Sequence, residues 1–370
     1  MKCLVTGGTG FLGRHLVRQL IEEGHTVRLL ARHRPLPPEP AGDDEESARE
    51  ELPDPSPSPD PADELGAEAV RGDVLDPSSL PAALQGIEVV YHLAGKVQHK
   101  GEPTELFRLH VDGTRHVLNA AAAAGVGRFV HMSTSGTVAV SRDRERIADE
   151  SAPFAIETVR RWPYYLSKIY AEKLALEAHV EGKLPVVVLN PSLLLGPEDV
   201  GRSSSEVLVS FLRREIPAIP TGGMNFVDVR DVALAAAAAA TRGRPGGRYL
   251  LGGPNMTLEA FFVMLSKVSG VPAPTLKSGT RATDLATRVL GTLEDVGGLE
   301  GEESVSYAMA NHYWYLDARK AHADLGFRAR SPEGTLRDAV QWLRAQGPLP
   351  ERKNTLGSLV RGVQRAIGRA

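Results

Sequence analysis

Tyr164 and Lys168 stand four residues apart in the segment WPYYLSK, and Tyr165 and Lys168 stand three apart. Either spacing brings a phenol and an ammonium onto one face of a helix. A free tyrosine has a pKa of about 10, too high for efficient proton transfer at neutral pH. Because a neighbouring ammonium stabilises the phenolate, the pair predicts a tyrosine with a lowered pKa that exchanges protons with a substrate. A surface pair above a packed aromatic ring is the structural alternative.

Three hydroxyl side chains, Ser133, Thr134 and Ser135, follow the apolar run 128–132. If that run is a strand of a parallel sheet, its carboxyl end opens into the crevice in which such sheets bind ligands. A carbonyl that accepts a hydride needs a proton donor, and a hydroxyl can hold the substrate oxygen beside that donor. The hydroxyls and the Tyr–Lys pair therefore form a complete set for hydride transfer.

The segment TGGTGFLG, residues 6–13, spaces three glycines between a predicted strand and a predicted helix. The first glycine permits a tight turn, the second lets the backbone approach a pyrophosphate, and the third lets the helix pack closely on the strand. The amino end of the helix, at Phe11 and Leu12, supplies N–H groups and the positive end of a dipole. The segment predicts a dinucleotide-binding loop, with a glycine turn that binds nothing as the alternative.

The second predicted strand ends at Ala31 and is followed by Arg32, His33 and Arg34. Where NAD is preferred, an acidic side chain near this position binds the ribose 2′-hydroxyl. A guanidinium can instead bind a 2′-phosphate through two parallel hydrogen bonds. The basic residues therefore favour NADP(H) over NAD(H), with Arg32 as the phosphate ligand. Stacking of Arg32 on the adenine is the alternative.

Two other strand ends are expected to hold the cofactor. Asp73 and Val74 follow the third predicted strand, where an adenine edge would lie. The fourth strand ends in Leu93, Ala94 and Gly95, where small residues would let the cofactor lie over the sheet. Both assignments follow from the order of the strands along the chain.

The elements that must position these residues alternate along the chain. Val-rich runs without alternation, separated by helices, predict a parallel sheet covered on both faces. The predicted strands are 2–6, 26–31, 68–72, 87–93, 128–132, 185–190 and 247–251, and the predicted helices are 11–23, 78–84, 104–123, 164–182, 205–214, 229–240, 257–269 and 332–345. The pattern predicts an α/β fold, a Rossmann doubly wound parallel sheet with a smaller C-terminal substrate-binding domain.

Two discontinuous domains are expected. Residues 1–197 with 224–253 are predicted to form the Rossmann NADP-binding domain. Residues 198–223 with 254–346 are predicted to form the substrate-binding domain, and 347–370 a C-terminal tail.

Two segments depart from the alternating pattern. Residues 35–61 contain nine prolines and nine acidic side chains. Such a segment buries too little apolar surface to offset the entropy of ordering, so it is predicted to be a disordered insertion. Residues 355–369 predict an amphipathic helix that packs on its own domain or on a partner subunit, with contact to a membrane surface as the alternative.

Composition excludes several classes of protein. The 43 basic and 46 acidic side chains give a formal charge of −3, which offers no footprint for nucleic acid. The single cysteine excludes a disulfide framework, and no apolar run reaches the length of a membrane span. None of the 11 histidines shows metal-ligand spacing, so no metal is predicted. A cytoplasmic enzyme is expected.

The motifs together resemble the extended short-chain dehydrogenases/reductases of the NAD-dependent epimerase/dehydratase superfamily. The similar pieces are TGGTGFLG, GDV at 72–74, HLAG at 92–95, VDGTRHVLNAA at 111–121, STSGTV at 133–138, YYLSK at 164–168, NPSLLLGP at 190–197 and NFVDVRDVA at 225–233. Within that family the chain is most similar to the dihydroflavonol-4-reductase-like branch, which includes bacterial members named as hopanoid-associated sugar epimerases. Members of the family often form homodimers through helices corresponding to 104–123 and 164–182.

The resemblance implies roles for individual residues. Tyr164, which has the family spacing to Lys168, would be the general acid/base, and Lys168 its partner. Ser135 fits the family serine best, with Thr134 as the second choice. The cofactor-binding residues expected from the motifs and the resemblance are Gly7, Gly10, Phe11, Leu12, Gly13, Arg32, Asp73, Val74, Leu93, Ala94, Gly95, Tyr164, Lys168, Pro191 and Ser192.

Two departures from the family pattern bear on the site. His110 stands where the family often has asparagine, and it is expected to be either a packed core histidine or a site residue. Asn190 stands where an arginine is frequent. These differences weaken the case for a nucleotide-sugar substrate more than the case for hydride transfer.

The prediction is therefore an NAD(P)-dependent oxidoreductase. Its simplest activity is NADPH-dependent reduction of a carbonyl, or the reverse oxidation, on a small apolar or mixed substrate. The substrate is expected near 196–225 and 255–320, in a region with Leu193, Leu194, Leu195, Phe211, Met224 and Phe226. An NAD-dependent nucleotide-sugar epimerase or dehydratase and a non-catalytic NADP-binding regulatory protein remain as alternatives.

Overall fold

The structure is a computed structural model that describes residues 1–32, 64–97, 103–277 and 308–347. The predicted insertion 35–61 and the amphipathic segment 355–369 lie outside those ranges, as do His33 and Arg34.

The centre of the molecule is a seven-stranded sheet in which every neighbouring pair is parallel. Its order is β10-β6-β5-β4-β1-β2-β3. The strands are β1 (Lys2–Thr6), β2 (Thr26–Ala31), β3 (Glu68–Arg71), β4 (Val89–His92), β5 (Arg128–Met132), β6 (Val186–Pro191) and β10 (Arg248–Leu251). The order reverses between β1 and β4, whose carboxyl ends therefore border the crevice in which doubly wound sheets bind ligands. The predicted Rossmann fold is confirmed.

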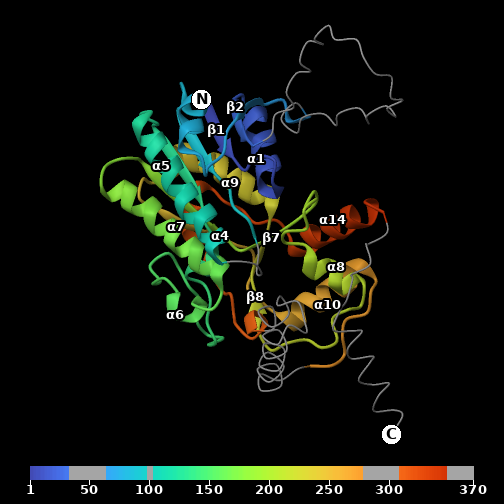
Figure 1. Ribbon diagram of the computed structural model, residues 1–370. Coiled ribbons are helices and arrows are strands. Elements are labelled where there is room, and N and C mark those ends of the chain that lie inside the picture. Colours follow the sequence, from blue (N-terminus) through green and yellow to red (C-terminus); the bar gives the residue numbers. More distant parts are fainter. Residues whose placement is uncertain (33–63, 98–102, 278–307, 348–370) are drawn as a thin grey trace, which may run out of the picture.

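Helices cover both faces of the sheet, as the strand composition predicts. Buried side chains of α1 (Phe11–Glu22), α9 (Val229–Arg242) and α13 (Arg319–Leu325) share one hydrophobic cluster with the sheet. Those of α3 (Leu80–Leu84), α5 (Gly113–Ala123) and α7 (Pro163–Val180) share another. Figure 1 shows α5 and α7 side by side, apart from α1 and α9. The alanine run of α9 has small side chains, which let that helix pack closely against α1.

The predicted helix 104–123 is interrupted in the structure. It consists of α4 (Pro103–Phe107), a π-helical turn η2 (Arg108–Asp112) and α5. The sequence pattern cannot distinguish this arrangement from one continuous helix, because the apolar spacing hardly changes over one turn. The turn places His110 in the interior, 2% exposed.

A second lobe lies beside the sheet. Its helices α8 (Glu206–Leu212), α10 (Leu258–Ser269) and α14 (Pro332–Ala345) lie in one part of the molecule (Figure 1), and their buried side chains belong to a separate hydrophobic cluster. The remaining short elements are β7 (Leu193–Leu195), β8 (Gly223–Met224), β9 (Phe226–Asp228), β11 (Met256–Thr257), α6 (Ile156–Val159), and the 3-10 turns η1 (Pro77–Ser79) and η3 (Ser135–Thr137). Strands of two or three residues carry no readable period, so the sequence does not predict them. The exact domain boundaries stay a prediction.

Candidate active site

The glycine loop is packed between β1, β4 and the start of α1. Gly7 has a φ of 74°, and a Cβ there would lie 2.9 Å from the backbone nitrogen of Ala94. A Cβ at Gly13 would lie only 2.2 Å from the Gly7 carbonyl oxygen. At Gly10, by contrast, a Cβ would meet only that same oxygen, at 3.2 Å. The outer two glycines are thus needed for the turn and the packing, whereas Gly10 lies on the more open side of the loop.

The amino end of α1 is suited to an anion. The helix begins at Phe11, its capping residue Gly10 offers no side-chain cap, and no acidic residue lies in the first turn. The first-turn N–H groups, at Phe11, Leu12 and Gly13, therefore keep their positive potential for a bound phosphate. The residues present fit the pyrophosphate of a dinucleotide.

The expected ends of β2, β3 and β4 meet at the same edge of the sheet. The backbone N–H of Leu93 donates to the carbonyl of Thr6 (3.1 Å), and that of Ala94 donates to Thr6 Oγ1 (3.2 Å). Ala31 pairs with Arg71, so exposed Arg32 at the end of β2 lies near the turn that holds Asp73. These contacts bring the glycine loop and the expected adenine-side residues together.

The three hydroxyls after β5 are not equivalent. Ser133 Oγ donates to the buried carboxylate of Glu172. Thr134 Oγ1 accepts the N–H of Gly136 (3.3 Å) and caps the 3-10 turn η3. Ser135 begins that turn, and within the described residues no hydrogen bond of its hydroxyl occurs. Of the three, Ser135 is therefore the best placed to hold a ligand oxygen.

Tyr164 and Lys168 lie on the first turns of α7, which starts at Pro163. Pro163 suits this place because a first-turn residue needs no N–H for the helix. Lys168 Nζ donates to the carbonyl of Met132 (2.7 Å), the last residue of β5, so the ammonium is held beside the hydroxyl segment. Burial lowers the pKa of Lys168 to about 8, while the charge of Glu172 opposes the shift.

Lys168 alone does not lower the tyrosine pKa, and a lowering with a positive nicotinamide ring beside the phenol stays a prediction. The Tyr164 side chain is partly exposed, but the protein around it removes water from the phenol. This desolvation raises the pKa of Tyr164 to about 12. Removal of the phenol from water disfavours the phenolate. At neutral pH the phenol is therefore protonated.

Tyr165 faces a different environment from Tyr164. Its ring packs on those of Trp162 (6.1 Å between centroids) and Trp314 (5.1 Å). A Cβ at Gly136 would lie 2.2 Å from the Tyr165 ring, so the ring is wedged against η3. Burial raises the pKa of Tyr165 above that of Tyr164. Tyr164 is thus the better candidate for proton transfer.

The comparisons with known proteins decide the family. Residues 3–252 match the NAD dependent epimerase/dehydratase family. The chain belongs to this family. Like its relatives, it is an NAD(P)-dependent enzyme of the extended short-chain dehydrogenase/reductase type.

Three similar proteins illustrate the family relationship. A protein of Synechocystis sp. named as dihydroflavonol 4-reductase-like is 34% identical, over 93% of this chain and 94% of its own length. The 4-hydroxy-2-methyl-3-oxo-4-farnesyl-3,4-dihydroquinoline-1-oxide ketoreductase of Stigmatella aurantiaca is 28% identical, over 95% and 100%. The solved structure of gox2253 superimposes with a TM-score of 0.77 at 30% identity, covering 93% of this chain and 98% of that one.

This family member also has a buried polar network that the sequence analysis missed. Glu172, fully buried, pairs with Arg248 of β10 (2.8 Å) and accepts the side-chain amide of Asn190 (2.8 Å). The network lies behind Lys168 and links α7 to β5, β6 and β10. Glu172 follows Lys168 by four residues on α7, and that spacing could have indicated a partner for the lysine.

Pro191 and Ser192, at the carboxyl end of β6, were expected near the nicotinamide. Pro191 ends β6, and the N–H of Ser192 donates to the carbonyl of Leu251 (2.8 Å). Ser192 is buried, and within the described residues its hydroxyl has no hydrogen-bond partner. These residues lie at the same edge of the sheet as Ser135, because β5 and β6 are parallel neighbours.

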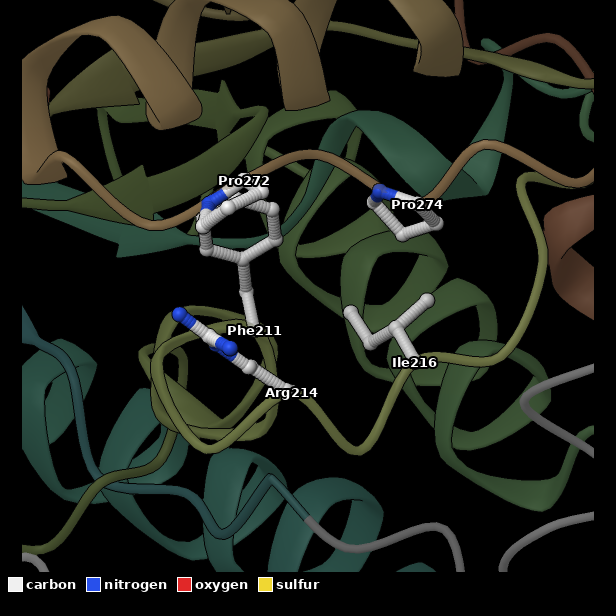
Figure 2. Close-up of a pocket in the computed structure, with 5 residues that line it drawn as sticks. All are labelled: Phe211, Arg214, Ile216, Pro272 and Pro274. Carbon is white, nitrogen blue, oxygen red and sulfur yellow. The ribbon is translucent and has the colours of Figure 1, made fainter.

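The predicted apolar substrate region is largely core. Leu195, Phe211, Met224 and Phe226 are buried in the cluster of the second lobe, and Leu193 and Leu194 are partly buried against neighbouring clusters. A hollow of about 120 Å³ does occur in this lobe, lined by Phe211, Arg214, Ile216, Pro272 and Pro274. Figure 2 shows the Phe211 ring pointing toward Pro272 and Ile216 toward Pro274. None of the expected catalytic residues lines it.

In the described ranges, no group of three His, Cys, Asp or Glu side chains is arranged to hold a metal ion. No helix in that part of the chain is long and apolar enough to cross a bilayer.

Proposed function

We propose that this enzyme reduces a carbonyl group of a small apolar or mixed substrate with NADPH, and oxidises the alcohol in the reverse direction. The observation that carries the proposal is that Lys168, on the same helix as Tyr164, is bonded to Met132 at the carboxyl end of β5, just before the segment that holds Ser135. Two neighbouring hydroxyls are already engaged, and Lys168 is tied to Met132, so the set is ordered before a ligand arrives. The names of the two relatives, a dihydroflavonol 4-reductase-like protein and a ketoreductase, agree with this activity.

In the reduction, Ser135 donates a hydrogen bond to the substrate carbonyl oxygen and Tyr164 gives that oxygen its proton. NADPH, when bound, would supply the hydride, and the positive ring left after transfer would favour the phenolate. The raised pKa of Tyr164 suits the donor role, because the phenol carries its proton at neutral pH. Lys168 keeps a positive charge beside the new phenolate, and the buried carboxylate of Glu172 helps to retain that charge.

The preference for NADP(H) rests on Arg32. Its exposed side chain ends β2, where an acidic residue would stand in an NAD-selective site. Its guanidinium would pair with the 2′-phosphate through charged hydrogen bonds.

A nucleotide-sugar epimerase or dehydratase is the second candidate, since the matched family is named for NAD-dependent epimerases and dehydratases. An epimerase would retain NAD and regenerate it within each turnover. Purified protein would then contain bound nicotinamide cofactor and would not consume added NADPH.

The deciding experiment compares Tyr164→Phe with Tyr165→Phe. NADPH consumption is followed at the reduced-nicotinamide absorbance band with a panel of aliphatic and aromatic ketones and aldehydes. Loss of the proton donor is expected to lower kcat by about 100-fold or more in Tyr164→Phe. Tyr165→Phe, the matched neighbour, is expected to retain most activity. A Tyr164→Phe enzyme with unchanged kcat would refute the assignment.

A further inference from the structure

His110 lies where the helix before α5 changes its hydrogen-bond pattern. It occupies the middle of the π-helical turn Arg108–Asp112 and is 2% exposed. Single π-helical turns inside helices occur frequently at functional sites, because the wider turn re-aims one side chain. Here the re-aimed side chain is an imidazole that points between the end of β4 and the start of α7.

The two ring nitrogens of His110 have distinct partners. The backbone N–H of Lys96 donates to Nε2 (3.0 Å), so Nε2 must be the acceptor. The ring proton then lies on Nδ1 and is donated to Ser167 Oγ (2.8 Å). Ser167 in turn donates its hydroxyl proton to the backbone carbonyl of Tyr164 (2.8 Å). Each donor has one acceptor, so the chain of hydrogen bonds has a single direction.

This chain requires a neutral imidazole. Burial, together with the charge of Lys168, lowers the pKa of His110 to about 3. A protonated ring would lose the bond from Lys96, because both nitrogens would then be donors. His110 is thus unsuited to acid–base chemistry at neutral pH and suited to holding other groups in place.

His110 also contacts the reacting side chain and the cofactor edge of the sheet. Its ring meets that of Tyr164 edge to face, with centroids 5.7 Å apart and planes at 78°. A Cβ at Gly95 would lie 3.2 Å from Nε2, so a side chain at that position would crowd the imidazole. One ring, carried by the π-helical turn, thus contacts both the loop after β4 and the start of α7.

We propose that His110 is a positioning residue for Tyr164. Through Ser167 it fixes the first turn of α7, and through Lys96 it ties that turn to the loop on which the cofactor would lie. The inference rests on the proposed reductase function. The proposed role of His110 is to hold the phenol in a fixed orientation toward the substrate oxygen. A misplacement of about 1 Å can cost about 100-fold in rate.

The test uses the full-length enzyme and the ketone panel described above. Ser167→Ala removes the hydroxyl that links His110 to Tyr164. Alanine favours the helix, so α7 should be preserved. His110→Phe keeps a ring but loses both hydrogen bonds, and His110→Asn restores an N–H near the position of Nδ1. His179→Gln is the control, since His179 lies in the last turn of the same helix and bonds to the carbonyl of Leu184.

Ser167→Ala and His110→Phe are each expected to lower kcat about tenfold, with the dissociation constant for NADPH changed less than about twofold. The alkaline limb of the kcat–pH profile, which reports the phenol, should move in both variants. The double variant should be no slower than the slower single variant, because both changes break one chain. His110→Asn should recover part of the rate, and His179→Gln should match the unmodified enzyme.

The outcomes separate this proposal from the proposed function. An unchanged kcat and pH profile in Ser167→Ala, with Tyr164→Phe inactive, would overturn the positioning role alone. Multiplicative losses in the double variant would also overturn it. Full activity in Tyr164→Phe would overturn both. If His110→Phe does not fold, Ser167→Ala decides, because that change removes one hydroxyl only.

Discussion

Arg32 is the single residue that is expected to set the preference for NADPH over NADH. A charged hydrogen-bonded pair contributes about 1.5 to 3 kcal/mol, or roughly 10- to 100-fold in affinity. Arg32→Ala is therefore expected to lower kcat/KM for NADPH by at least about tenfold and to leave that for NADH nearly unchanged. Steady-state rates with both cofactors measure the ratio.

Arg337 provides the matched control for this prediction. It is exposed on α14, in the second lobe, and has no expected role in cofactor binding. Arg337→Ala should keep the original NADPH-to-NADH ratio. If Arg32→Ala keeps it too, Arg32 does not bind the 2′-phosphate.

Individual site residues differ in how far the sequence could reveal them. Tyr164 and Lys168 can be found because their spacing on one helix face has a chemical meaning. The pKa of Tyr164 could not be predicted, since it depends on how much water the fold removes from the ring. Arg248 could not be found as the partner of Glu172, because only the order of the strands brings β10 behind α7.

The start of α1 and its glycine loop form one unit at the scale of elements. A Cβ at Gly13 would lie 2.2 Å from the Gly7 carbonyl oxygen and 2.7 Å from the backbone of Gly8. Relief of that overlap must move the helix away from the loop. Gly13→Ala is expected to cost about 1 to 3 kcal/mol of stability and to weaken NADPH binding by at least about tenfold.

Gly334 is the control for this substitution. It lies in α14, and a Cβ there would lie at an ordinary contact distance of 3.8 Å from the Cβ of Ser331. Gly334→Ala should therefore be neutral or raise the free energy of unfolding by up to about 1 kcal/mol. Urea unfolding and fluorescence titration with NADPH measure both variants. Tight NADPH binding by Gly13→Ala would show that the loop tolerates the methyl group.

Long elements were predictable to within a residue or two, and short ones were not. The Val-rich run 128–132 and the helix 332–345 coincide with β5 and α14. The π-helical turn at 108–112 escaped prediction because it preserves the apolar face of the helix. Pairs such as β8 with β11 arise from contacts between distant segments, which no local pattern contains.

The order of the strands in the whole molecule explains contacts that single elements do not explain. Parallel strands joined by helices predict a doubly wound sheet, since crossovers of one hand wind outward from a central strand. The position of the reversal, between β1 and β4, then explains why the glycine loop and Gly95 lie together. The second lobe was expected as a substrate domain, but its apolar residues mostly fill its own core.

Buried histidines make the stability of the whole fold depend on pH. Burial lowers the pKa of His92 and of His110 to about 3, and that of His131 well below its usual value. In the unfolded chain these rings bind protons below about pH 6.5. Between that pH and the pKa values of the rings in the folded protein, the unfolded state holds more protons than the folded state. The free energy of unfolding therefore falls as the pH falls. From pH 6.5 to 5 each ring is expected to cost on the order of 2 kcal/mol.

His131 offers the cleanest measurement of this effect. In the described part of the chain neither of its ring nitrogens has a hydrogen-bond partner, so His131→Phe removes a titrating group without breaking a bond. Urea unfolding at pH 7 and pH 5 should show a smaller loss of stability in this variant, by about 2 kcal/mol. His322→Asn, on the exposed side of α13, should keep the full loss. Equal losses in His131→Phe and the unmodified protein would mean that the His131 ring takes up its proton in the folded state as readily as in the unfolded chain.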